Sequence, residues 1–147
     1  MPSGQVAAAD ARSVRQPTMS VQQAIKRANK VLPGVPAPGG EPDIRWKRII
    51  DVSVYVDSDP EPVWTFIEHW GGHESEDLRT AVGLCLLEHL LGHHFDLIFP
   101  RVERRAAEDP LFAYTFRTCR KMGQAETPEH AARWDALLTR VPGSSAA

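Results

Sequence analysis

The chain has 147 residues, which suits one domain with a single hydrophobic core and is too short for two domains of ordinary size. Hydrophobic residues make up 42% and charged residues 24% of the sequence, close to globular averages, which excludes a wholly disordered chain. The formal net charge of −2 excludes a strongly basic protein, the class most typical of nucleic-acid binding.

The N-terminal part is predicted to hold a tail, a helix and a strap. Residues 1–18 are small and polar without a sustained apolar period, which is typical of a disordered tail, so we expect their deletion to leave the melting temperature unchanged. Met19 stands directly before a helix predicted over residues 20–31 with Ser20 as its N-cap, which makes Met19 an alternative start to Met1. Proline and glycine then predict an irregular strap at 33–42.

A helix is predicted to begin at Asp43, since apolar residues recur there near the 3.6-residue period. The residues of this stripe are Ile44, Trp46 or Lys47, Ile50, Val54 and Val56. A short strand is the alternative for 52–56, where valines alternate with other residues. The next helix is predicted to start at Pro60 behind the N-cap Asp59 and to end at Gly71-Gly72.

The strongest helical pattern runs from residue 76 to 94. Ser75 is its predicted N-cap, and Glu76 and Asp77 in the first turn oppose the positive end of the helix dipole. The pattern contains leucines that point in nearly every direction around the helix: Leu84, Leu86, Leu87, Leu90 and Leu91. A helix with apolar residues all round is enclosed by its neighbours, so we expect this one to lie at the centre of the core.

Three further helix starts are predicted in the C-terminal part. Asp96 is the expected cap of a helix with Pro100 near its first turn and with a buried stripe at Phe95, Phe99, Val102 and Ala106. Asp109-Pro110 and Thr127-Pro128 open the next two helices. The Asp-Pro pairs at 59–60 and 109–110 suggest a helical repeat, although this pair is also a common way to start any helix.

Together these elements predict an all-α fold of five to seven helices, a compact bundle or a short stack of helical hairpins. We expect one domain over residues 19–140 and a disordered tail at 141–147. The longest apolar stretch, 81–91, is too short to span a bilayer. Cys85 and Cys119 are not part of a dense cysteine framework, so we expect reduced thiols and a cytoplasmic location.

A cluster of cysteine and histidines on the central helix is the most inviting candidate for a metal site. Cys85, His89 and His93 share a stripe, but the outer two lie about 12 Å apart along the axis, too far for one ion. His89 and His93 could bind zinc with a third ligand from His69, His73 or His130, which gives a metal- or His-dependent enzyme as the alternative function. The preferred interpretation is that they are ordinary packed residues, and we expect no cofactor.

The other chemical motifs favour neither catalysis nor nucleic-acid binding. A cysteine–histidine dyad is conceivable in any small protein with six histidines, and the common phosphate-binding and hydrolase motifs are absent. Residues 101–121 carry six basic side chains against three acidic ones, but the isoelectric point near 6.3 argues for a solvated face rather than a nucleic-acid surface.

An acidic segment is the candidate for recognition. Residues 41–78 carry ten acids and three basic residues. From the predicted helices we expect an acidic patch formed by Glu61, Glu68, Glu74, Glu76 and Asp77. Such a patch suits a basic protein partner, whose association it would accelerate.

The stretch Leu86-Leu87-Glu88-His89-Leu90-Leu91, followed by Val102-Glu103 and by Asp109-Pro110-Leu111-Phe112, resembles a group of bacterial all-helical proteins of unknown function. The resemblance covers about 30 to 60 residues. It implies a small all-helical domain and offers no catalytic residues to carry over.

The sequence therefore predicts a bacterial protein-interaction domain without enzymatic activity. An immunity- or antitoxin-like inhibitor is the specific form that the acidic segment suggests. We expect a protein partner, no membrane association and no nucleic acid, and a homo-oligomer is compatible with the pattern.

Overall fold

The computed structural model describes residues 19–39 and 41–141, so the predictions for the tails at 1–18 and 142–147 lie outside the described residues. The described part contains seven helices, counting α5, η1 and α6 as one continuous helix, and no strand, which confirms the all-α prediction. The elements are α2 (Val21–Val31), α3 (Ile44–Ser53), α4 (Pro60–Trp70), α5 (Glu76–Val82), the π-helical segment η1 (Gly83–Leu87), α6 (Glu88–His93), α7 (Phe95–Glu108), α8 (Pro110–Thr118), the 3-10 turn η2 (Gly123–Glu126) and α9 (Pro128–Arg140).

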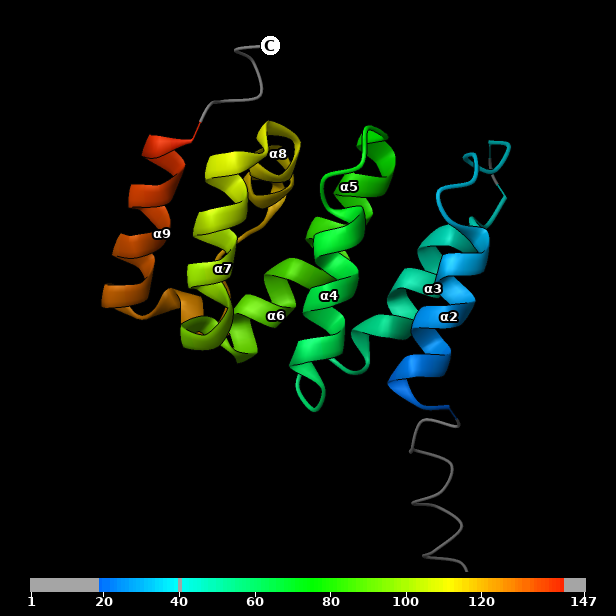
Figure 1. Ribbon diagram of the computed structural model, residues 1–147, viewed down its shortest axis with the longest axis horizontal. Helices are drawn as coiled ribbons and strands as arrows, with labels where there is room; N and C mark the ends of the chain where they lie inside the picture. Colours follow the sequence, from blue (N-terminus) through cyan, green and yellow to red (C-terminus); the bar gives the residue numbers. More distant parts are fainter. Residues whose placement is uncertain (1–18, 40, 142–147) are drawn as a thin grey trace, which may run out of the picture.

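The helices form two layers (Figure 1). The front layer consists of α2, α4, α7 and α9, whose starts follow one another at intervals of roughly 35 residues, as in helical-hairpin repeats. The back layer consists of α3, α5 and α8. All four front helices run in the same direction, because α2, α4 and α7 are each followed by a return through the back layer or, at α6, between the layers. Their C-terminal ends therefore lie along one edge of the molecule.

The centre of the core is the continuous helix from α5 to α6, as the sequence predicts. Leu86, Leu87, Leu90 and Leu91 are fully buried, and the Ser75 hydroxyl accepts the backbone N–H of Leu78 at the helix start. At Gly83 the π-helical segment lies so close to α8 that a Cβ atom would fall 2.3 Å from the hydroxyl oxygen of Thr118. No helix among the described residues is long and apolar enough to cross a membrane.

The buried face of α3 differs from the prediction. Ile49 and Val52 face the core together with Arg45, whereas Ile44, Ile50 and Val54 are exposed. Arg45 is buried because its guanidinium donates to both Asp43 and Asp77 and to the carbonyl of Pro33. This network fixes the rotation of α3, so Ile44, Ile50 and Val54 of the predicted stripe face outside, whereas its last member, Val56, is buried after the end of α3 and Trp46 packs partly against the core.

Some local predictions also need correction. The helix predicted to reach Val56 ends at Ser53, and the turns that follow exclude the alternative of a strand at 52–56. Asp96 is no N-cap: α7 begins one residue earlier, at Phe95, and Pro100 lies inside the helix.

The two Asp-Pro pairs occupy unequal places in the stack. Asp109 accepts the N–H of Leu111 at the start of the back helix α8. Asp59 makes no side-chain cap at the start of the front helix α4, and neither does Thr127 at the start of α9. The pairs are therefore helix starts and not a repeat marker.

Specific contacts fix the strap and the C-terminal end of the described domain. Gly34 in the strap has a φ of +54°, and a Cβ there would lie 2.6 Å from the carbonyl oxygen of Val31, so the turn needs glycine. At the C-terminal end Val141, which the sequence places in the tail, is buried, and Arg117 donates to its carbonyl.

Candidate interaction surface

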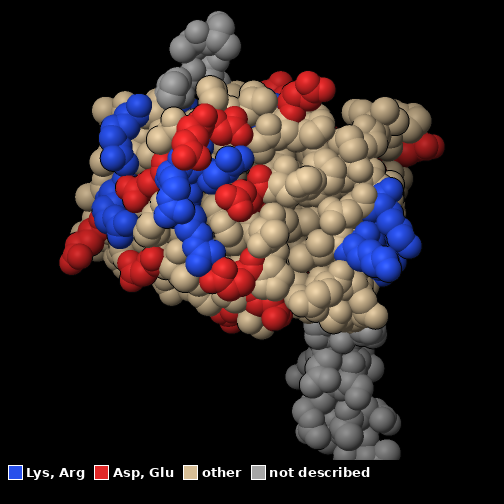
Figure 2. Space-filling model, in the orientation of Figure 1, with Lys and Arg blue, Asp and Glu red and all other residues tan. Residues whose placement is uncertain are grey.

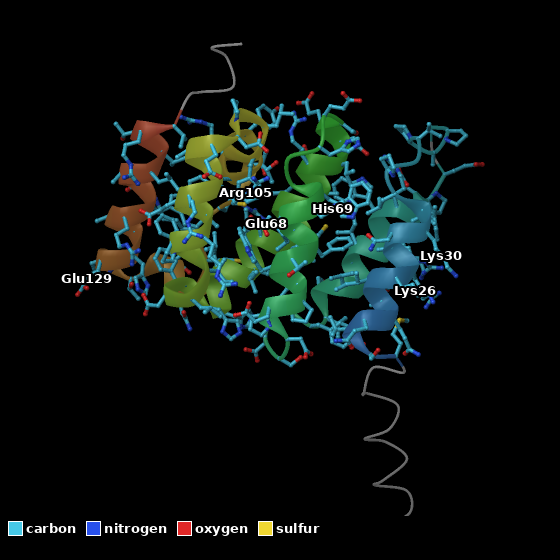
Figure 3. All side chains as sticks on the ribbon, viewed as in Figure 1. Lys26, Lys30, Glu68, His69, Arg105 and Glu129 are labelled. Atoms are coloured by element: carbon cyan, nitrogen blue, oxygen red, sulfur yellow. The ribbon has the colours of Figure 1, made fainter. Side chains whose placement is uncertain are left out.

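Two depressions adjoin on the front layer, one along α4 beside α2 and one at the C-terminal ends of α4 and α7. The first, the α2–α4 groove, has a volume of about 370 Å³ and is lined by Ile25, Asn29, Pro62, Thr65, Phe66, His69 and Trp70. The second, the α4–α7 cleft, has a volume of about 460 Å³ and is lined by Glu68, His69, Gly72, His73, Glu74, Arg105, Asp109 and Leu111. His69 lines both, so the groove and the cleft adjoin at this residue (Figure 3), and together we call them the trough.

The groove is mainly apolar and has a rigid wall. The indole N–H of Trp70 donates to the side-chain oxygen of Asn29 at 2.8 Å, which ties α4 to α2. The His69 ring stands edge-on against Trp70, with ring centroids 4.6 Å apart. Since the polar end of Trp70 is satisfied within the protein, the groove offers mostly carbon surface to a ligand.

The cleft carries an excess of negative charge. Its carboxylates are those of Glu68, Glu74 and Asp109, and its only guanidinium among the lining residues is that of Arg105. Arg105 donates to Asp109 at 3.4 Å, but its Nε lies 3.8 Å from Glu68 and has no hydrogen-bond partner. Glu68 is thus held only loosely by Arg105, and its carboxylate oxygens remain able to accept hydrogen bonds from a ligand.

Hydrogen bonds within the protein hold the backbone around the cleft in place. The N–H of Ser75 donates to Nδ1 of His73, and Arg79 donates to the carbonyls of His73 and Glu74. Gly72 lets the Asp109 carboxylate approach closely, because a Cβ at this position would lie 2.3 Å from that carboxylate.

The structure separates the five residues of the predicted acidic patch. Glu68 and Glu74 reach the cleft, whereas Glu61 lies in the first turn of α4 and forms a two-bond ion pair with Arg101, which lowers the pKa of Glu61. Glu76 accepts the Tyr114 hydroxyl, and this hydrogen bond raises the pKa of Tyr114. Asp77 accepts from Arg45 and from the Trp46 indole. Acids and bases are interspersed over the α7 and α9 side of the front face, and a group of basic side chains lies at the opposite, α2 end (Figure 2).

Most residues of the trough are not among the candidates that the sequence suggests. Arg105 and Asp109 are four residues apart on one helix face, a spacing that indicates an ion pair but not what the pair faces. The lateral packing of α4 against α2 and α7 creates the groove and the cleft, and no local pattern encodes it. Glu68 and Glu74 could be chosen in advance on charge alone, and the sequence suggests His69 and His73 only as possible metal ligands.

The histidines proposed as metal ligands lie on the open side of α6. His89 is near the buried Glu88, at 3.9 Å, while His93 is 3.6 Å from the exposed carboxylate of Asp57. Glu88 accepts the backbone N–H and a guanidinium N–H of Arg120. Within the described residues no group of three or more His, Cys, Asp or Glu is arranged to hold a metal ion.

The cysteines and the basic segment make structural contacts. Burial raises the pKa of Cys119 well above its ordinary value, and its thiol donates to the carbonyl of Gly83. The pKa of Cys85 is raised for the same reason. Five of the six basic residues at 101–121 contact protein acids or carbonyls: Arg101, Arg105, Arg117, Arg120 and Lys121.

Comparison of the chain with protein-family models, with curated proteins and with solved structures finds no match.

Proposed function

We propose that this protein is a non-enzymatic interaction domain that binds a segment of another protein in the trough. A Lys or Arg side chain of the partner enters the α4–α7 cleft, and a neighbouring apolar side chain enters the α2–α4 groove. The observation that supports this most directly is the junction of an apolar groove and an acidic cleft at His69. Depressions of about 370 and 460 Å³ are of the size that binds side chains or a short peptide.

The charge balance of the cleft supports a cationic anchor. Three carboxylates face one guanidinium, and Glu74 has no side-chain partner among the described residues. The basic side chain would replace water around Glu68 and Glu74 without breaking the bond between Arg105 and Asp109. An inhibitor of a basic toxin, of the immunity or antitoxin type, is the specific form of this proposal.

The polar groups of the trough support binding rather than catalysis. Nδ1 of His73 accepts a backbone N–H, the Trp70 indole is bound to Asn29, and Asp109 caps α8. These hydrogen bonds fix the walls of the trough, so the bonded atoms are not free to act on a substrate. The alternative, an enzyme using His89 and His93, predicts stoichiometric zinc in the purified protein that is lost in the His89→Ala variant.

Selection from a random peptide library tests the proposal. We expect the protein to enrich peptides with a Lys or Arg close to an aromatic or aliphatic residue. The E68Q/E74Q variant should bind a selected peptide at least tenfold more weakly, because the cleft loses both loosely held carboxylates. Binding should also weaken as the salt concentration rises from roughly 0.05 to 0.5 M, since salt screens exposed charges.

Glu129 provides a matched control, because it is exposed on α9 at the far end of the front layer (Figure 3). The E129Q variant should bind the selected peptide as the unchanged protein does. Selected peptides without a basic residue, or equal binding by E68Q/E74Q and E129Q, would contradict the proposal.

A further inference from the structure

The outer face of α3 carries a row of apolar side chains that nothing in the described chain covers. Ile44 is 45% exposed, Ile50 50% and Val54 58%, although side chains of this type are usually buried. α3 uses its opposite face, with Arg45, Ile49 and Val52, to pack against its neighbours. These side chains form the apolar stripe that an amphipathic helix usually buries, but in this structure they face solvent.

Charged residues in the same row make the face self-complementary. Lys47 is exposed between Ile44 and Ile50, and Asp51 lies one turn further along. If a second copy of α3 lies antiparallel across a two-fold axis near residue 49, Ile44 meets Val54 of the partner subunit. The same axis places Lys47 beside Asp51 of the partner subunit, and both contacts occur twice, as in any isologous interface.

Lys47 and Asp51 can both form an ion pair with a second copy of the chain. Lys47 has no ion pair among the described residues, and Asp51 is 31% exposed with one contact, to Arg48 at 3.2 Å. Ile50 lies beside the axis, where the two copies contribute the same apolar residue.

We propose that two copies of this chain associate through α3 as an antiparallel, two-fold symmetric dimer. The matched positions of Ile44 with Val54 and of Lys47 with Asp51 favour a second copy over an unrelated protein. A contact made mainly by one helix from each subunit is small, so the dimer is weak and forms at micromolar concentration or above. Because α3 belongs to the back layer, the trough on the front layer stays open, and the dimer does not depend on the proposed function.

Sedimentation velocity of the full chain between roughly 5 and 500 µM tests the dimer. We expect the sedimentation coefficient to rise from that of a monomer towards that of a dimer. Ile50→Asp should weaken the association at least tenfold. Leu97→Asp is the matched control, because Leu97 is 40% exposed on α7 and away from α3, and it should leave the association unchanged.

A charge swap tests the geometry of the pairing. K47E and D51K should each weaken the dimer, since each places like charges opposite one another, and K47E/D51K should restore it. Thermal unfolding of every variant shows whether the fold is kept. A chain that stays monomeric at the highest concentration would overturn the proposal. The apolar row would then be a binding site for residues 1–18 or for an unrelated protein. Failure of the double variant to recover association would overturn it as well.

Discussion

Leu87 offers a test of how strongly a single side chain of the central helix contributes to stability. It is fully buried in η1 among the helices of both layers. Leu87→Ala should lower the free energy of unfolding by about 2 to 5 kcal/mol, because it removes buried surface and leaves a cavity. Leu97→Ala, at a site that is 40% exposed, should cost less than about 1 kcal/mol. Urea unfolding measures both, and a small loss for Leu87→Ala would show that the core can collapse around the change.

Asp43 should make stability depend on pH in the acid range. The Arg45 guanidinium, which binds the Asp43 carboxylate, lowers the pKa of Asp43 from 3.8 to about 2. A carboxylate with a lowered pKa contributes stability above its ordinary pKa and loses that contribution as the pH falls towards 2. Asp43→Asn keeps a cap for α3 but removes the charge, so it should destabilise the protein by about 1 to 2 kcal/mol at neutral pH.

The check is urea unfolding of both proteins between pH 6 and 2, where the difference in unfolding free energy should shrink on acidification. A difference that stays constant over this range would show that the Asp43 charge does not stabilise the fold.

Pro100 offers a test at the level of a whole helix. It lies inside α7 with an exposed ring, and its missing N–H leaves the carbonyl of Asp96 without its usual helical donor. Pro100→Ala should stabilise the protein by about 1 kcal/mol or more, because the helix gains a hydrogen bond and loses a steric clash. Pro110→Ala is the matched control. Pro110 occupies the first position of α8, where no helical bond is missing, so its replacement should bring no gain. Equal melting temperatures for Pro100→Ala and the unchanged protein would show that α7 is already relaxed around the proline.

The elements were largely predictable from the sequence because their start signals are local. Ser20, Ser75 and Asp109 act as the caps that the sequence indicates, and the leucine-rich helix is central as expected. The rotation of α3 could not be predicted. It depends on Arg45 meeting Asp77, a residue 32 positions away, and this contact outweighs the apolar stripe.

The same limit applies to the candidate site. Charge alone points to Glu68 and Glu74, but the groove and the cleft exist only because α4 packs between α2 and α7. Ion pairs with distant residues, such as Glu61 with Arg101 and Asp77 with Arg45, neutralise part of the predicted acidic patch. Ion pairs between residues far apart in the sequence cannot be identified until the fold is known.

At the scale of the whole molecule, the order of the helices has a consequence for how the chain folds. Each front helix packs mainly against elements close to it in sequence, and chains with such local contacts fold fast and without long searches. In a linear stack the end units have neighbours on one side only and open first. Native-state hydrogen exchange should therefore find the slowest amides in η1 and α6 and faster ones in α2 and α9. Equal protection of all helices would instead indicate one cooperative unit. If the gradient is present, the α2 wall of the groove detaches and returns many times for each global unfolding event, and a bound peptide would slow that local opening.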